Sequence, residues 1–511
     1  VASRATATSI GQTVHHALMS NWARFQSKLG KKSAAPKPAP PKSAVPPAEP
    51  SKTETTTPLL PIGPPSLLDE RRKNNSDVPI RVSPSSSSNT IIASSPALEA
   101  ARLRAIWRLG ERFRETCSAL GSKRYFSHFE TWLWAARAGA GLDGSCVPVI
   151  PAPGGVVARA ELSRKLTSAG TTEADARAAC DALDACCVTL ADELRALERR
   201  PKPPTAVTLR RGSAEADASP NNKKTRKRKR ENAAQEAPDG SGAADSEQPP
   251  AVVRLGFEDV EVVVTEAHFD KLRTLFKAAR KKDSKEEEDE DERSFRAAAF
   301  CCLARLFSLQ GGHEHAGGMQ GACPQGVFDV LRAEFGVTCE LFASPLNCRY
   351  PRFCSASIDV DAAFGSYGSF FAFKPLSGAF LANPPFDPEL VSAMSKRIDS
   401  LMDAANAANE ILHIIVVIPT WPDKECWVAV KDSVHCQKVL TLPKSKHAYI
   451  DGGQHQGRRA KPLRLSNHDS SLFLLQSKKA ASLTPLNFAR ERKLREAFTA
   501  GLKILGRLDK A

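Results

Sequence analysis

The stretch from Gly378 to Asp387 joins a short apolar run directly to a strongly periodic helix. Asp387 can act as the helix N-cap, Pro388 takes the first helical position and Glu389 lies in the first turn. The apolar residues that follow share one helical face: Leu390, Met394, Ile398, Leu401 and Met402. Asn383-Pro384-Pro385-Phe386 is therefore predicted to be a tight loop at the carboxyl end of a strand, where open α/β sheets place their ligands.

The side chains of this loop suit the transfer of a methyl group to an aromatic amine. An adenine amine is a poor nucleophile because its lone pair is delocalised into the ring. The carbonyls of the Asn383 side chain and of Pro384 can accept its two N–H bonds, and the prolines stiffen the loop. Phe386 offers a flat face for stacking, so positioning and fixed dipoles would supply the catalysis. The alternative is a Pro-Pro turn with Phe386 in the core.

From Pro324 onward, helical and strand patterns alternate, which is typical of a βαβ sheet. Helices are predicted at 326–335 and 487–508, strands at 338–343, 354–360, 411–418, 438–442 and 472–475, and a basic loop at 444–461. The run 411–418 is apolar almost throughout, as in a buried parallel strand.

Composition favours a polyanionic partner and argues against other kinds of site. The net charge is +15 and the pI is about 9.3, which points most simply to nucleic acid. The thirteen cysteines form no pair of CxxC motifs, so buried free thiols are expected in place of a structural zinc. His313 and His315 lack further ligands nearby, and no metal is expected. No apolar stretch approaches the roughly 20 residues of a membrane span.

Changes in composition divide the chain into six parts. They are a disordered basic and Pro/Ser-rich tail at 1–96, a helical domain at 97–200, a disordered linker at 201–250, a helical extension at 251–322 with an acidic loop at 286–292, a sheet domain at 323–478 and a basic helix at 479–511. The linker run Lys223–Arg230 has seven basic residues in eight and predicts nuclear import. The acid-free segment 1–32 also fits a mitochondrial transit peptide.

Three features after successive strands form a methyltransferase arrangement. A polar loop at Ser344–Asn347 would hold the methionine part of S-adenosylmethionine, and Asp359 or Asp361 would bind the ribose hydroxyls. Asn383–Phe386 would hold the reacting amine. The first loop contains no G-x-G sequence, and Ser344-Pro345-Leu346-Asn347 stands in its place.

Several motifs in this order resemble the cap-specific adenosine N6-methyltransferases, also known as phosphorylated-CTD-interacting factors. The resemblance covers residues from about 324 to 476. It is carried by Leu341–Cys348, Phe364-Gly365-Ser366, Pro375–Gly378, Asn383–Phe386 and Ile418-Pro419-x-Trp421. The family methylates N6 of the 2′-O-methyladenosine that follows the 7-methylguanosine cap of messenger RNA. The resemblance therefore implies a Rossmann-like, S-adenosylmethionine-dependent fold, capped mRNA as the substrate and a nuclear location.

The resemblance also implies roles for individual residues. Asn383, Pro384, Pro385 and Phe386 would line the catalytic and cofactor site, which Ser344, Asn347 and Asp361 would complete. Glu389, Trp421, Pro422 and Asp423 would border the RNA, and Arg137, beside an aromatic cluster at 126–134, is a further candidate contact. That cluster could equally be core.

Two features depart from the family pattern. Pro388 replaces an acidic residue just after the motif, and residues 1–96 show no paired-tryptophan segment of a WW domain, which would bind the phosphorylated tail of RNA polymerase II. Three alternatives stay open: a DNA adenine methyltransferase, a protein glutamine methyltransferase, and a non-catalytic RNA-binding factor. The first two usually keep a glycine-rich first loop, and the intact Asn383 and Phe386 argue against the third.

Overall fold

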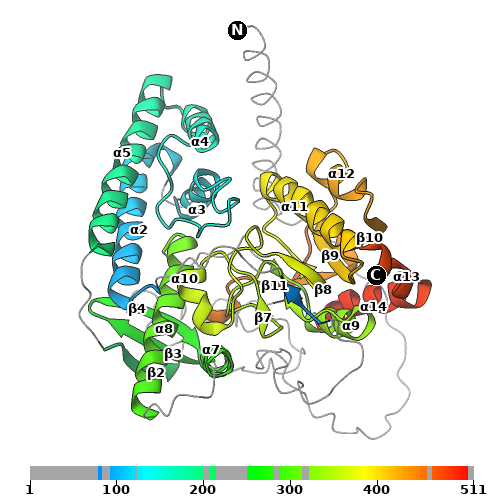
Figure 1. The fold of residues 1–511 in the computed structure, drawn as a ribbon. Helices are drawn as coiled ribbons and strands as arrows, with labels where there is room; N and C mark the ends of the chain where they lie inside the picture. The colour runs from blue at the N-terminus through cyan, green and yellow to red at the C-terminus, as the bar shows by residue number, and fades with distance from the viewer. Residues whose placement is uncertain are drawn as a thin grey trace, which may run out of the picture.

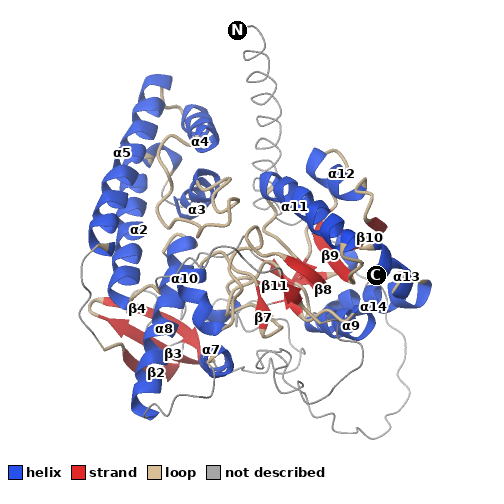
Figure 2. Ribbon diagram, viewed as in Figure 1, coloured by secondary structure: helices blue, strands red, loops and turns tan. Residues whose placement is uncertain are grey.

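In the computed structural model, the described residues are 79–82, 93–121, 125–199, 206–213, 250–280, 288–312, 321–456 and 463–504. They form a mixed α/β molecule in which a helical part, with a small sheet below it, stands beside a larger sheet (Figures 1 and 2). The basic run 223–230, the histidines 313 and 315, and nearly all of the 1–96 tail lie outside these residues. Within the described ranges, no helix is both long and apolar enough to cross a bilayer.

Four α-helices build the described portion of the helical part. They are α2 (Pro96–Thr116), α3 (Tyr125–Ala136), α4 (Val156–Ser168) and α5 (Glu173–Glu198). Ser95 caps α2 and Thr172 caps α5, each through a side-chain oxygen that accepts a backbone N–H. Phe129, Trp132 and Leu133 of the aromatic cluster are buried in the core of this part, whereas Phe126 is 43% exposed.

A three-stranded antiparallel sheet follows, in the order β2-β3-β4. Its strands are β2 (Thr208–Ser213), β3 (Ala251–Phe257) and β4 (Val260–Thr265). The helices α7 (Glu266–Ala279) and α8 (Glu288–Leu309) pack against it around Phe269, Phe295 and Phe300. The predicted acidic loop at 286–292 is therefore wrong from residue 288 onward. Residues 288–292 begin α8 because Glu292 pairs with Arg273 and Arg296.

The larger sheet carries the order β10-β13-β9-β8-β6-β7. Its strands are β6 (Cys339–Glu340), β7 (Arg352–Phe353), β8 (Pro375–Ala382), β9 (Leu412–Pro419), β10 (Cys436–Leu442) and β13 (Ser470–Gln476). Strands β7, β6, β8 and β9 are mutually parallel, whereas β13 runs antiparallel to both β9 and β10. The chain goes from β6 to β7 on one side and from β8 to β9 on the other, so the winding reverses between β6 and β8.

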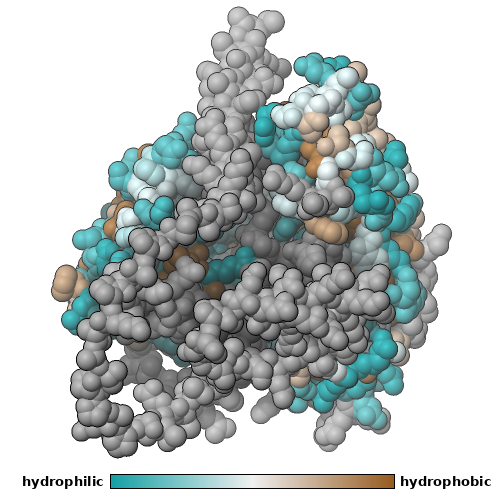
Figure 3. Space-filling view, turned by 180° about the vertical axis from the view of Figure 1, so that it is seen from behind, coloured by the Kyte–Doolittle hydropathy of each residue, from teal (hydrophilic) through white to brown (hydrophobic). Residues whose placement is uncertain are grey.

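Helices cover both faces of this sheet. On β8, Ala379 and Leu381 face a core shared with α9 (Gln325–Phe335) and α14 (Phe488–Ile504). The alternate residues Phe380 and Ala382 face α11 (Pro388–Ala407) and α12 (Glu425–Lys431). Strand β1 (Arg81–Val82) pairs with the beginning of β8. Seen from behind, the described surface is largely hydrophilic, with only small apolar patches (Figure 3).

Three predictions about the sheet need correction. The strand at 354–360 is wrong, because β7 ends at Phe353 and Ile358–Asp361 forms the short helix α10. There the Val360 and Asp361 N–H groups donate to Ser357 O. Of the strand predicted at 338–343, only the two residues of β6 are in a strand. The basic loop at 444–461 contains β11 (Ala448–Asp451), which pairs with β5 (Gly321–Ala322) and β12 (Leu463–Leu465).

Candidate active site

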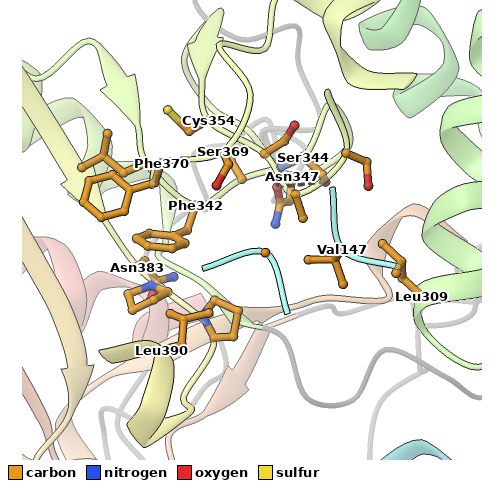
Figure 4. Close-up of a pocket in the computed structure, with 18 of the residues that line it drawn as sticks. Val147, Leu309, Phe342, Ser344, Asn347, Cys354, Ser369, Phe370, Asn383 and Leu390 are labelled. Carbon is orange, nitrogen blue, oxygen red and sulfur yellow. Dashed lines mark hydrogen bonds between the residues drawn. The ribbon is translucent and has the colours of Figure 1, made fainter. Parts of the chain in front are cut away.

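A cavity of about 290 Å³ lies where the loops after β6, β7 and β8 meet the segment after α3. Its walls include Asn383 after β8, Leu390 of α11, Ser344 and Asn347 after β6, and Val147 from the helical part (Figure 4). The Val147 N–H donates to Ala356 O at 3.1 Å, so the helical part is tied to the loop after β7. The cavity therefore occupies the point where the winding of the sheet reverses, which is the usual ligand position in open α/β sheets.

Asn383 enters this cavity directly from the end of β8. Its Nδ2 donates to Gly321 O at 2.8 Å. Because a carbonyl oxygen only accepts hydrogen bonds, this contact fixes which end of the amide points toward β5. The Oδ1 atom at the other end is buried and has no hydrogen-bond partner among the described residues. A buried acceptor without a partner is costly, which makes it suited to an N–H donor of a ligand.

The rest of the loop leads into α11 through the cap that the sequence predicts. Asp387 Oδ1 accepts the Leu390 N–H at 2.8 Å, and Pro388 starts α11, so the predicted cap is confirmed. The Phe386 ring is half-buried and lines the cavity. It lies edge-on to Trp421, Tyr449 and His468, with ring centroids 6.5, 6.3 and 5.5 Å away. Burial lowers the pKa of His468, which favours the neutral ring beside Phe386.

The loop after β6 is closed by its own side chains. The Ser344 N–H and hydroxyl both donate to Asn347 Oδ1, at 2.7 and 3.1 Å (Figure 4). The Cys348 N–H donates a hydrogen bond to Ser344 O at 2.9 Å. This side-chain turn gives the loop a fixed shape without a glycine. Both Ser344 and Asn347 line the cavity, as the sequence predicts a cofactor loop would.

The two candidate acids of α10 have different surroundings. Asp361 is 6% exposed and lines the cavity, and burial raises its pKa to about 7. Asp359 instead pairs with Arg305, at 2.7 Å, and accepts from Cys146 Sγ at 3.3 Å. Burial alone would raise the pKa of Asp359, but the hydrogen bonds from Arg305 outweigh it and lower the pKa. Of the two, Asp361 is the acid available to a ligand.

The predicted RNA-facing residues are not gathered in the cavity. Pro422 and Asp423 are exposed beyond the end of β9, and Glu389 is exposed on α11. Trp421 reaches the site through its contact with Phe386, and the Lys424 ammonium lies 5.1 Å from its ring centroid.

Arg137 lines the cavity, but its guanidinium binds backbone carbonyl groups of the protein. Its guanidinium donates to Leu309 O at 2.7 Å and to Val149 O, and a longer bond of 3.4 Å reaches Ser308 O. It thereby joins the end of α3 to the last carbonyls of α8. Burial lowers its pKa to about 10.

Sequence reasoning missed three residues of the cavity wall. Glu340 is buried at the end of β6, and burial raises its pKa to about 7. Phe342 is half-buried near Asn383 (Figure 4), and its ring centroid lies 5.2 Å from that of Phe370. Gly321 holds Asn383 from a strand 62 residues away. A charged residue inside an apolar strand pattern could have singled out Glu340, but no local signal identifies Gly321. Across the described ranges, no three His, Cys, Asp or Glu residues are grouped to hold a metal ion.

Comparison with known proteins identifies relatives of the region that contains this cavity. The family model described as "Phosphorylated CTD interacting factor 1 WW domain" matches residues 271–452, which include the cavity loops after β6, β7 and β8. This part of the chain is therefore similar to the phosphorylated CTD interacting factors. The family resemblance predicted from the motifs is thereby confirmed.

Two curated relatives are each named mRNA (2'-O-methyladenosine-N(6)-)-methyltransferase. The protein from Mus musculus is 35% identical over 230 residues, and that from Homo sapiens is 35% identical over 229 residues. Each match covers 44% of this chain and 31% of the relative. The chain thus spans less than one third of the length of these relatives. Their activity is therefore only proposed for this chain.

The expected lack of a WW domain is corrected by the same comparison, because the matching model is described by that domain. The tail at 1–96, which contains no paired-tryptophan segment, lies almost wholly outside the described residues. The described residues within this match contain both helices and strands, from α7 to β11.

Proposed function

We propose that this chain is a Rossmann-like, S-adenosylmethionine-dependent methyltransferase that modifies N6 of the cap-adjacent 2′-O-methyladenosine of mRNA. The order of the larger sheet supports the fold, because four parallel strands reverse their winding at the cavity. The names of the two curated relatives support the substrate. We further propose that residues 97–200 form a helical domain, 251–322 an extension and 323–478 the catalytic domain, which α14 follows.

The observation that carries this proposal is the unpartnered Oδ1 of Asn383. Together with the Pro384 carbonyl, it would accept the two N–H bonds of an adenine amine. These contacts hold the nitrogen lone pair toward the methyl donor and favour a pyramidal nitrogen. Because no strong base is needed, catalysis rests on fixed dipoles in a partly closed site. The cofactor supplies an electrophilic methyl group on a sulfonium ion.

The cavity residues fit this cofactor. The Ser344–Asn347 loop would hold its methionine part, Asp361 its ribose hydroxyls, and Phe342 would pack on its base. Phe386 would stack on the target adenine, and Trp421, Pro422 and Asp423 would border the RNA beyond it. Glu389 lies on the same helix as the motif and would contact RNA further out. Arg137 would shape the cavity wall rather than bind the substrate, since its guanidinium already donates hydrogen bonds to backbone carbonyl groups.

Capped mRNA is the proposed partner, and the description of the matching family model supports the RNA polymerase II C-terminal domain as a second one. The basic run 223–230 supports a nuclear location. These partners agree with the net charge of +15.

The test uses purified protein, labelled S-adenosylmethionine and two short RNAs that begin with 2′-O-methyladenosine, of which one carries a 7-methylguanosine cap. The proposal expects transfer only to the capped RNA, at N6 of its first adenosine. Equal transfer to both RNAs, or transfer to a DNA adenine, would refute cap specificity. Cofactor binding without transfer to any nucleic acid, followed by transfer to a glutamine-containing protein, would refute the RNA substrate.

A further inference from the structure

The loop after β6 lacks the glycines that usually bring a backbone close to this kind of cofactor, yet its shape is strongly fixed. The Ser344–Asn347 turn closes one end. The remaining peptide groups, from Leu346 to Tyr350, are held by two buried charged side chains from outside the loop.

The first of these side chains is Lys271 of α7, which is 6% exposed. Its ammonium donates to Leu346 O at 2.9 Å and to Cys348 O at 2.5 Å. Burial lowers its pKa, and nearby Glu340 acts in the opposite sense. Lys271 does not line the main cavity. It lines a separate space of about 30 Å³ behind the loop, together with Leu346, Asn347 and Cys348.

The second side chain is Glu340, which holds the far end of the loop. Its Oε1 accepts the N–H groups of Arg349, at 2.5 Å, and Tyr350, at 3.1 Å. Glu340 lines the main cavity, so the loop is fixed by an acid on its ligand side and by a cation behind it. The Lys271 contacts join residues that a short sequence window cannot connect, since Lys271 lies 75 residues from Leu346.

We infer that Lys271 is a positioning residue that presents the Ser344–Cys348 loop to the amino-acid end of S-adenosylmethionine. This inference rests on the proposed function. The ammonium polarises the peptide groups whose carbonyls it binds, and it places a positive charge directly behind the cavity wall. A carboxylate bound in front of the loop feels that charge through a medium of low dielectric constant, which strengthens the attraction. In this chain, the hydrogen bonds from Lys271 fix the shape of a loop that contains no glycine, and they add a positive charge behind it.

The test measures binding of S-adenosylhomocysteine to the full chain by calorimetry. Lys271→Met leaves two buried carbonyls without their donor, and the dissociation constant should rise about tenfold or more. The KM for capped RNA should stay within about threefold of the wild-type value. The control is Lys277→Met, at an exposed position of the same helix, which should bind as the wild type does. A folded Lys271→Met variant with unchanged affinity would overturn the inference.

Two further measurements keep the outcomes separate. Lys271→Arg retains the charge and the donors and should recover most of the affinity, whereas an equal loss in the Arg and Met variants would show a purely steric role. If Lys271→Met does not fold, Lys271→Gln, which lacks the charge, takes its place with the same expectation. Wild-type binding that depends on Lys271, combined with no transfer to capped RNA, would refute the proposed substrate and leave this inference standing. Failure of the wild type to bind S-adenosylhomocysteine would overturn both.

Discussion

The side chain of Asn383 donates to the carbonyl of Gly321 at 2.8 Å, and this single contact orients the opposite end of its amide into the cavity. Gly321 lies on β5, which pairs with β11. The acceptor atom is therefore positioned by a strand outside the main sheet as well as by its own loop.

Asn383→Ala should abolish methyl transfer while leaving the protein folded, because it removes an acceptor that has no structural partner. Loss of one preorganised hydrogen bond at a reacting centre costs about 10²–10³ in kcat. Rates with labelled cofactor, compared with S-adenosylhomocysteine affinity and thermal unfolding, would measure this loss. Asn383→Asp is the matched variant: it keeps an acceptor but places a carboxylate against Gly321 O, so it should also be impaired. Near-normal turnover by Asn383→Ala would exclude the proposed role.

Phe386→Ala should weaken the use of RNA substrate. Base stacking on an aromatic side chain contributes about 1–3 kcal/mol, so kcat/KM for capped RNA should fall by about 5- to 150-fold. Steady-state kinetics at saturating cofactor would test this. Phe488→Ala, at a position 83% exposed on α14, is the control and should change nothing. If Phe386→Ala lowered only the thermal stability, its contacts with Trp421, Tyr449 and His468 would be packing alone.

Local sequence rules were sufficient to predict the Asn383–Phe386 loop. Pro388 and Asp387 specify the start of α11, and the apolar run before the loop becomes β8, because caps and strand patterns depend on neighbouring residues. The same rules failed at 354–360, where the apolar alternation suggested a strand. Arg305, 54 residues earlier, binds Asp359 at that point, and the segment forms a helical turn instead.

The rest of the site depends on contacts between distant parts of the chain, which one sequence does not reveal. Gly321, Lys271 and Arg305 each act on a loop more than 50 residues away. The sequence could not distinguish Asp359 from Asp361 as the ligand-binding acid. In the structure, Asp359 forms an ion pair with Arg305, whereas Asp361 lines the cavity.

Arg305→Met should destabilise the protein strongly. Arg305 is 3% exposed and binds both Glu99 of α2 and Asp359 of α10, each at 2.7 Å. Removing it leaves Arg102, among the described residues, as the one remaining cation beside the two carboxylates. Breaking a buried ion pair costs about 3–5 kcal/mol, which sets the upper limit of the expected loss. Urea unfolding of the full chain would measure the change. The control is Arg108→Met, whose partner Glu193 lies at the surface and which should cost at most about 1 kcal/mol. Equal effects in the two variants would contradict the burial argument.

Asp361 should make stability depend on pH between about 4 and 7. Burial raises its pKa in the folded protein to about 7 from an ordinary 3.8. In this window the folded state holds a proton that the unfolded chain releases, so the free energy of unfolding falls as pH rises. Asp361→Asn mimics the protonated acid and should not lose this stability. The difference between variant and wild type, from urea unfolding at pH 5 and pH 8, should therefore grow in favour of the variant.

Asp359→Asn provides the opposite control for this pH effect. The pKa of Asp359 is lowered in the folded protein, so its carboxylate is ionised in both states throughout the range from pH 5 to pH 8. Asp359→Asn should weaken the ion pair with Arg305 and destabilise the protein by the same amount at both pH values. A stability difference for Asp361→Asn that stays constant between the two pH values would show that Asp361 is ionised in the fold. In that case burial would not control its charge.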